Sequence, residues 1–271
     1  MADVIDRPLR TLLDSGIFIH SEFGQAATRE TRVPWGNINL VVPVSGIVRK
    51  APDENPEYQS QKDALFTVGR LIREGRVEAF DYSEINFEGM RSGRTTWCYA
   101  LSECRIQRCP PAVERTKFRQ TMNFKDLVAK GGKKDRKAGV ELGQANQIAF
   151  FSWLNELTDD QIQVLLKHAA QIRLTEFETK NLRNLGWYQT LCRRSQSPEN
   201  FPDVFHLWTA ECNGLDAVLT LDQGLQKLVY SVSRERSRVI EIKTEVLRPL
   251  DLLQKLGVSM PDDVTSLFRA S

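Results

Sequence analysis

The chain is 271 residues long, with 41% hydrophobic residues, 27% charged residues and a formal net charge of only +2, a composition typical of globular proteins. No apolar run approaches the roughly 18 residues of a membrane-spanning helix, and the first ten residues, MADVIDRPLR, lack the apolar core of a signal peptide. Five widely spaced cysteines are typical of a reducing compartment, so we expect a cytoplasmic protein without membrane contact.

The N-terminal third predicts strands that alternate with helices, because runs of apolar residues change from strand-like to helical spacing. Glycine and proline separate these runs, and Gly75 is placed to end the first long helix. The predicted elements are a strand over Thr11–Asp14 followed by a helix or turn, extended chain or a hairpin over 33–48, a polar loop over 51–61, a helix over 65–72, a strand over 77–82 and a helix capped by Ser83.

The rest of the chain predicts mainly helices, with two further strands near the C-terminus. Thr158 followed by two aspartates predicts a capped helix start. The predicted elements are a basic loop over 130–139, helices over 145–158, 159–174 and 204–215, strands over 216–222 and 238–249, and a closing helix over 250–258. Alternating strands and helices predict an α/β fold with a mostly parallel central sheet.

Acidic residues stand at the ends of the predicted strands. Asp14 and Asp222 each close an apolar strand, Glu84 and Glu88 lie on the helix after a third strand, and Asp203 opens the helix before the Asp222 strand. In a parallel sheet the carboxyl ends of the strands share one edge, where open α/β folds bind their ligands. Converging carboxylates repel one another, and a divalent cation relieves this repulsion. Oxygen ligands favour Mg²⁺ or Mn²⁺.

The simpler interpretation of Asp14 is a helix N-cap, since Asp before a helix is ordinary capping chemistry. Likewise, Asp203 could cap a helix after Pro202, and Glu88 could be an exposed helical residue. The residue types alone leave these alternatives open.

The order of the segments LLDSGIFI, YSEINFEGM, PDVFHLWTAECNGLDAVLTLDQGL and VIEIKTEVLRPLDLLQKLG resembles the PIN domain, a nuclease fold found in VapC-type toxins and RNA-processing endonucleases. The matching positions are Asp14 with Ser15 in a threonine slot, Glu88 after Ser83, Asp203 with Ala210, and Asp222 with Thr220. Glu84 is the less favoured second acid. Where the family often has another Asp after the fourth acid, this chain has Gln223 and Gly224.

The resemblance implies a three-layer α/β/α domain that hydrolyses phosphodiester bonds, most often in RNA, with Mg²⁺ or Mn²⁺. It covers about residues 7–90 and 199–258 of a single domain spanning 1–271, and leaves about 91–198 as a basic, helical insertion. It also implies that Asp14 and Asp222 are direct metal ligands, and that Asp203 and Glu88 bind a second ion or act through water. Ser15 and Thr220 would orient waters or phosphate oxygens.

The charge distribution points to the same class of partner. Residues 91–140 hold 13 Lys and Arg against 4 Asp and Glu, a net +9, so the remainder carries −7. A segregated basic segment is typical of a polyanion-binding face, although a solvated loop gives the same pattern. The residues predicted to contact nucleic acid are Lys130, Lys133, Lys134, Arg136 and Lys137.

Two other functions remain open at this point. A degenerate member of the same fold would bind nucleic acid or a partner protein without cutting, and a toxin would be held inactive by an antitoxin or assemble with copies of itself. Trp97, Tyr99 and Trp153 are possible base-stacking platforms, with core packing preferred for each. His206 lies near Asp203 and could face the site, with a packing or surface role preferred.

Overall fold

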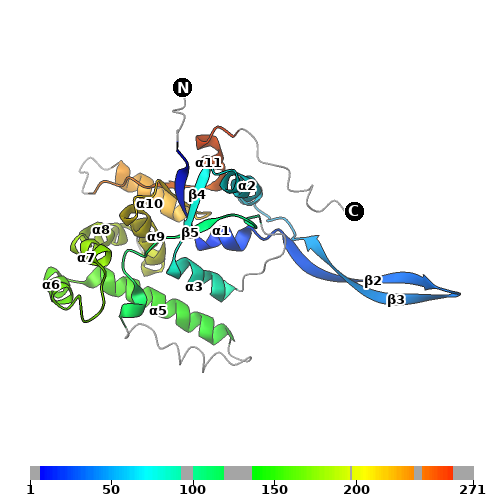
Figure 1. The fold of residues 1–271 in the computed structure, drawn as a ribbon, viewed down its shortest axis with the longest axis horizontal. Helices are drawn as coiled ribbons and strands as arrows, with labels where there is room; N and C mark the ends of the chain where they lie inside the picture. The colour runs from blue at the N-terminus through cyan, green and yellow to red at the C-terminus, as the bar shows by residue number, and fades with distance from the viewer. Residues whose placement is uncertain (1–6, 93–99, 119–135, 196, 235–239, 259–271) are drawn as a thin grey trace.

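The computed structural model of the chain describes residues 7–92, 100–118, 136–195, 197–234 and 240–258. Its centre is a five-stranded, all-parallel sheet in the order β5-β4-β1-β6-β7, flanked by helices (Figure 1). The strands are β1 (Leu9–Leu13), β4 (Val77–Asp81), β5 (Ile106–Arg108), β6 (Ala217–Leu219) and β7 (Glu245–Leu247). The predicted three-layer α/β/α fold is therefore confirmed.

Two of the sheet strands, β6 and β7, are shorter than the sequence predicts, and a third, β5, was not predicted. The apolar stretches 216–222 and 238–249 each contain only three residues with strand pairing, in β6 and β7. The remaining residues of the first stretch turn into the next helix at Asp222. The edge strand β5 has no apolar run that would have predicted it.

Helices pack on the sheet and on one another. Helix α9 packs on β1 and β6, with α5 and α8 against its outer side, while α2 packs on β4 and α11. The α-helices are α1 (Ser15–His20), α2 (Pro56–Arg73), α3 (Ser83–Ser92), α5 (Arg136–Glu156), α6 (Asp159–Lys167), α7 (Glu176–Arg183), α8 (Gly186–Arg194), α9 (Phe201–Cys212), α10 (Gln223–Ser233) and α11 (Pro249–Lys255).

Several predicted helix boundaries are wrong, for local reasons. The predicted polar loop over 51–61 contains the start of α2, because Asn55 caps the helix by accepting hydrogen bonds from the Glu57 and Tyr58 amides and Pro56 occupies its first turn. Asn and Pro are typical of turns as well, so the sequence alone did not distinguish a helix start from a loop. The helix predicted over 159–174 has the expected Thr158 capping box but ends at Lys167.

The segment over 91–198 contributes to the same hydrophobic core as the sheet. Phe150 and Phe151 of α5 are fully buried and pack against Phe205 of α9. Trp153 packs against Phe118 and Phe150, so the prediction of core packing rather than base stacking is confirmed for this residue. Trp97 and Tyr99 lie outside the described residues.

The predicted hairpin is present and longer than the sequence indicates. Strands β2 (Gly24–Trp35) and β3 (Ile38–Arg49) pair antiparallel over their whole length and extend away from the sheet (Figure 1). Gly36 in the connecting turn has φ of +61°, a left-handed conformation that glycine adopts at little cost.

None of the described helices combines the length and the apolar character needed to cross a bilayer.

Candidate functional site

Asp14 and Asp222 follow neighbouring strands of the sheet, β1 and β6, and each begins a helix. Asp14 accepts a hydrogen bond of 2.6 Å from the Ser15 amide, and Asp222 accepts one of 2.7 Å from the Gly224 amide. The N-cap interpretation of Asp14 is therefore correct as far as it goes. Because capping fixes each carboxylate at the carboxyl edge of the sheet, it also holds both acids where a ligand would bind.

Thr220 connects these two acids. Its hydroxyl donates to Asp14 Oδ2 at 2.9 Å and accepts from the Asp222 amide at 3.0 Å. Thr220 is only 2% exposed, so neither bond competes with bulk water. The residue predicted as a supporting group thus sets the position of the Asp14 carboxylate relative to the Asp222 backbone.

Gly224 approaches the Asp222 carboxylate closely. A Cβ atom at this position would lie 3.2 Å from Oδ1 and 3.3 Å from Oδ2 of Asp222. A side chain here would crowd the carboxylate, which explains locally why the chain has glycine where the PIN pattern often has another acid.

Glu88 and His206 complete a compact cluster with Asp14. Ligand atoms of the three residues all lie within 4.8 Å of one another. His206 Nε2 is 3.5 Å from Glu88 Oε1 and 3.9 Å from Asp14 Oδ1. Glu88 also accepts a hydrogen bond of 2.7 Å from Gln147 of α5 and one from the Ser15 side chain. Its side chain is 12% exposed, so Glu88 is not the exposed helical residue of the simpler interpretation.

His206 is the site residue that the sequence did not predict. Its side chain is almost completely buried, and Nδ1 bonds the Tyr82 hydroxyl at 2.6 Å. Nε2 is buried, and within the part of the chain that the structure describes its near neighbours are carboxylate oxygens, with Glu88 Oε1 at 3.5 Å. The spacing of three residues from Asp203 places both side chains on one face of α9, which is the signal that could have identified it. The expected packing role is confirmed by the burial of His206 against Tyr82, and the same side chain also faces Glu88 and Asp14.

Glu84, the alternative second acid, has a different role. It forms a bidentate salt bridge of 2.8 and 2.9 Å with Arg115, and both side chains are nearly inaccessible. Gln147 contacts both glutamates, at 3.3 Å for Glu84 and 2.7 Å for Glu88. Of the two acids of α3, Glu84 thus belongs to a structural ion pair and Glu88 belongs to the cluster.

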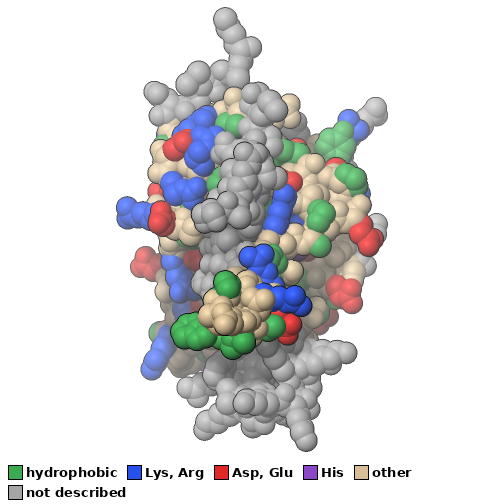
Figure 2. Space-filling view, turned by 90° about the vertical axis from the view of Figure 1, so that its right-hand side faces the viewer, with side chains coloured by type: hydrophobic (Ala, Val, Ile, Leu, Met, Phe, Trp, Pro, Cys, Tyr) green, Lys and Arg blue, Asp and Glu red, His purple; other side chains and the backbone are tan. Residues whose placement is uncertain are grey.

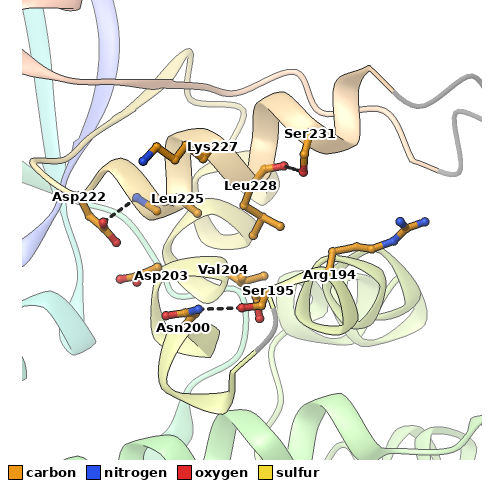
Figure 3. Close-up of a pocket in the computed structure, with 11 residues that line it drawn as sticks. Arg194, Ser195, Asn200, Asp203, Val204, Asp222, Leu225, Lys227, Leu228 and Ser231 are labelled. Carbon is orange, nitrogen blue, oxygen red and sulfur yellow. Dashed lines mark hydrogen bonds between the residues drawn. The ribbon is translucent and has the colours of Figure 1, made fainter.

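Asp203 and Asp222 lie at one end of a pocket of about 400 Å³ beside the cluster (Figure 3). Asp203 belongs to the first turn of α9 but does not cap it, so the capping alternative for Asp203 is wrong. Arg194 lies at the opposite end of the pocket, and Lys227 extends from α10 above it. The pocket therefore has an acidic end and two basic residues in its lining. Its volume is within the range of small-molecule sites.

The electrostatics of the site show that these groups share one environment. Burial, followed by the charge of Asp14, raises the pKa of Asp203 to about 8, and Asp222 and Glu88 contribute in the same direction. Burial raises the pKa of Asp14 as well, and Glu88 adds to this effect. The charges of Asp14, Asp222 and Glu88 therefore oppose the ionisation of Asp203.

His206 partly offsets this repulsion. Burial alone would lower the pKa of His206, but Glu88, then Asp14 and Asp203, raise it to about 9. Burial would raise the pKa of Glu88, whereas the charge of His206 and hydrogen bonds from Ser15 and Gln147 lower it to about 2. In the metal-free protein at neutral pH, an imidazolium therefore lies against the carboxylates.

The donor set fits a divalent metal ion. Carboxylate oxygens of Asp14 and Glu88 are the hard ligands that Mg²⁺ and Mn²⁺ prefer, and the Asp203 carboxyl group interacts electrostatically with both. The Nε2 atom of neutral His206 would be a further donor, with Nδ1 held by Tyr82 in the way that metal-bound histidines are held by a second group. A mixed oxygen and nitrogen set is better suited to Mn²⁺ than to Mg²⁺.

The structure describes only part of the segment that holds the predicted nucleic-acid contacts. Lys130, Lys133 and Lys134 lie outside the described residues. Arg136 and Lys137 begin helix α5, so the last part of the predicted basic loop over 130–139 is helical.

The fold and the cluster define an α/β protein with an acidic pocket at the carboxyl edge of a parallel sheet. No protein-family model matches the chain, and neither a curated protein nor a solved structure matches it. The geometry of the site and the motif resemblance are therefore the only indications of function.

Proposed function

We propose that the protein is a metal-dependent nuclease of the PIN type that cleaves RNA in the cytoplasm. The observation that carries the proposal is the meeting of Asp14, Glu88 and His206 within 4.8 Å at the carboxyl edge of the sheet. Asp203 and Asp222 line the adjoining pocket. Residues from β1, α3, α9 and the end of β6 converge here, which is the arrangement that the four PIN motifs imply.

When bound, Mg²⁺ or Mn²⁺ supplies a water of lowered pKa and neutralises charge on the scissile phosphate. Asp14 and the exposed Asp222 would be direct ligands of the ion, and Glu88 and Asp203 would bind a second ion or act through water. Thr220 keeps the Asp14 carboxylate in place, and Ser15 does the same for Glu88. No side chain acts as the nucleophile in this account.

The pocket supplies a place for the nucleotide next to the scissile phosphate. Lys227 and Arg194 line it from two helices and would provide positive charge for phosphate oxygens; in Figure 3 the Lys227 ammonium extends toward the Asp222 side and Arg194 lies at the other end. Two cations beside the acids favour a polyanionic substrate over a neutral one.

The direct test is cleavage of labelled single-stranded RNA, single-stranded DNA and duplexes by the purified protein with Mg²⁺, Mn²⁺ or chelator. We expect metal-dependent cleavage of RNA, faster with Mn²⁺, and none with chelator. Binding without cleavage under all metal conditions would instead identify a degenerate member of the fold.

The two glutamates of α3 form a matched pair of variants. Glu88→Gln removes a carboxylate from the cluster, and we expect cleavage to fall by about 100-fold or more, the loss of about 3 kcal/mol of transition-state stabilisation. Glu84→Gln leaves Arg115 buried without its partner and should destabilise the fold by about 3–5 kcal/mol. Cleavage rates measured well below each melting temperature should show Glu84→Gln close to wild type. Equal activity losses in the two variants would contradict the assignment.

The basic segment remains a prediction that solution measurements can test. Replacing Lys130, Lys133, Lys134, Arg136 and Lys137 by Gln should weaken binding to single-stranded RNA and flatten its salt dependence. If all five contact phosphates, the slope of log K against log salt should decrease by about 3–4. Titrations at several salt concentrations measure this slope, and an unchanged slope would assign the segment to a solvated surface.

A further inference from the structure

The hairpin of β2 and β3, here called the arm (Gly24–Arg49), has two different faces. In an antiparallel pair, residues directly opposite each other point to the same side of the ribbon. The cross-strand pairs that define one side are Gln25–Val48, Ala27–Gly46, Arg29–Val44, Thr31–Val42, Val33–Leu40 and Trp35–Ile38. We call this side the apolar face, because Arg29 is its only charged residue.

The opposite side of the arm carries most of its charged residues, Glu30, Arg32 and Arg49, beside apolar ones such as Val41 and Pro43. Its cross-strand pairs include Thr28 with Ser45, whose hydroxyls are 3.2 Å apart, and Arg32 with Val41. Figure 2 looks along the arm from its tip and shows hydrophobic side chains gathered on one side of it, with Lys and Arg side chains mainly on the other. The arm is therefore amphipathic with a period of two.

The apolar face is open to solvent. Trp35 is 69% exposed and Ile38 is 59% exposed at the tip, and the other large side chains of the face are 38–43% exposed. Together they expose an area on the order of 600 Å² per chain, at the upper limit for a patch on a monomer and close to one side of a standard protein interface. A two-stranded hairpin is at best marginally stable in water by itself, so burial of this face against a partner surface would stabilise the arm.

We propose that the apolar face binds the same face of a second copy of this chain, so that two arms pack antiparallel as a four-stranded, two-layer stalk. The two-fold axis passes through the Thr31–Val42 pair. This placement keeps the two bodies at opposite ends of the stalk, since each strand of twelve residues spans about 40 Å.

Size complementarity along the face supports this register. With the axis at Thr31–Val42, Trp35 of one chain lies over Ala27 of the other, and Ile38 lies over Gly46. A Cβ atom on Gly46 would have no heavy atom within 4 Å, so the space above it is open. The largest side chains at the tip thus face the smallest residues near the base.

The distribution of charge supports the same register and a second copy of the chain as the partner. An axis through the Arg29–Val44 pair would bring two Arg29 side chains together, whereas the proposed axis separates them and places each near Val33 of the other chain. The apolar face has no acidic residue to attract a basic partner and only one cation to attract an acidic one. A second copy offers the matching aliphatic surface.

Adjacent residues on opposite faces provide the test. Val42→Arg places two like charges on the axis, and Val41→Arg adds the same charge to the opposite face. Sedimentation of the full-length wild type should give twice the 31.0 kDa chain mass at about 10 µM protein. Val42→Arg should weaken the dimer by about 100-fold or more, and Val41→Arg by no more than about threefold.

A second pair of variants excludes trivial loss of folding. Under mild oxidation, Val42→Cys should form a disulfide-linked dimer on a gel without reducing agent, and Val41→Cys should not. A monomeric wild type, or a dimer that Val42→Arg leaves intact, would overturn the proposal. So would a monomer that binds lipid vesicles through Trp35, since the face would then be a membrane contact. Nuclease activity is not part of this readout, so the outcome is independent of the proposed function.

Discussion

Asp14→Asn should abolish cleavage and leave the fold intact. Asn removes the negative charge from the centre of the cluster, where Asp14 lies 3.9 Å from His206 and is bonded to Thr220. We expect the cleavage rate to fall by about 1,000-fold or more, which corresponds to about 4 kcal/mol of transition-state stabilisation.

The fold should tolerate this change for two reasons. Asn is about as good an N-cap as Asp, so the bond from the Ser15 amide that begins α1 is preserved. The pKa of Asp14 is raised by burial, so the charged form is disfavoured in the metal-free protein and a neutral side chain relieves that cost. Circular dichroism should show an unchanged spectrum, with a melting temperature no lower than wild type.

Asp222→Asn is the companion variant. Its carboxylate also caps a helix, by accepting from the Gly224 amide, and it should likewise lose cleavage without loss of fold. Full activity in both variants would end the proposal of a metal-dependent nuclease.

Asp203→Asn should stabilise the metal-free protein at neutral pH. Burial and the neighbouring carboxylates raise the pKa of Asp203 from 3.8 to about 8, so the folded protein holds a proton that the unfolded chain has released. This contribution to stability is fully present below pH 4 and is lost as the pH rises toward 8. Asn avoids this loss, and at pH 7 we expect a gain on the order of 3 kcal/mol, or roughly 5–10 °C in melting temperature.

The pH dependence separates Asp203 from its neighbours. His206, with a pKa raised to about 9, also contributes stability that is lost as the pH rises above 6.5, but it is present in both proteins. The difference in free energy of unfolding between Asp203→Asn and wild type should therefore grow from pH 4 to pH 8 and then level off. Denaturant titrations at several pH values in chelator measure it. A constant difference would show that Asp203 does not share the acidic environment.

Addition of Mn²⁺ should reverse the order of stability. An ion that binds only the folded wild type stabilises it by about 2.7 kcal/mol at a concentration one hundred times its dissociation constant. Asp203→Asn lacks one of the ligands and should gain less. This reversal distinguishes a metal ligand from a merely buried acid.

Much of the site could be predicted from the chain because the acids follow strands. Asp14 and Asp222 stand directly after apolar runs, and a parallel sheet brings such positions to one edge whatever lies between them. The choice of Glu88 over Glu84 came from the PIN pattern. Its physical reason, the pairing of Glu84 with Arg115, depends on a contact between residues 31 positions apart in the chain that no local pattern contains.

The parts that were missed depend on tertiary structure. His206 lies in a helix whose other residues are almost all buried, so the composition of the helix favours core packing. The spacing from Asp203 is a local signal, but the contact with Glu88 depends on tertiary structure. The strands β6 and β7 are shorter than their apolar runs because pairing, not hydrophobicity, sets strand length. The apolar pattern of β3 predicted extended chain, but not that the strand would remain uncovered.

Binding of Mn²⁺ to the purified protein tests the central claim most directly, because it requires no substrate. Calorimetric titration at pH 7 should show saturable binding to wild type, with proton release as His206 loses its proton, and binding weakened by about 100-fold or more in Asp14→Asn. Proton release should appear as a dependence of the measured heat on the buffer. Equal binding by both proteins, or none by wild type, would contradict the account.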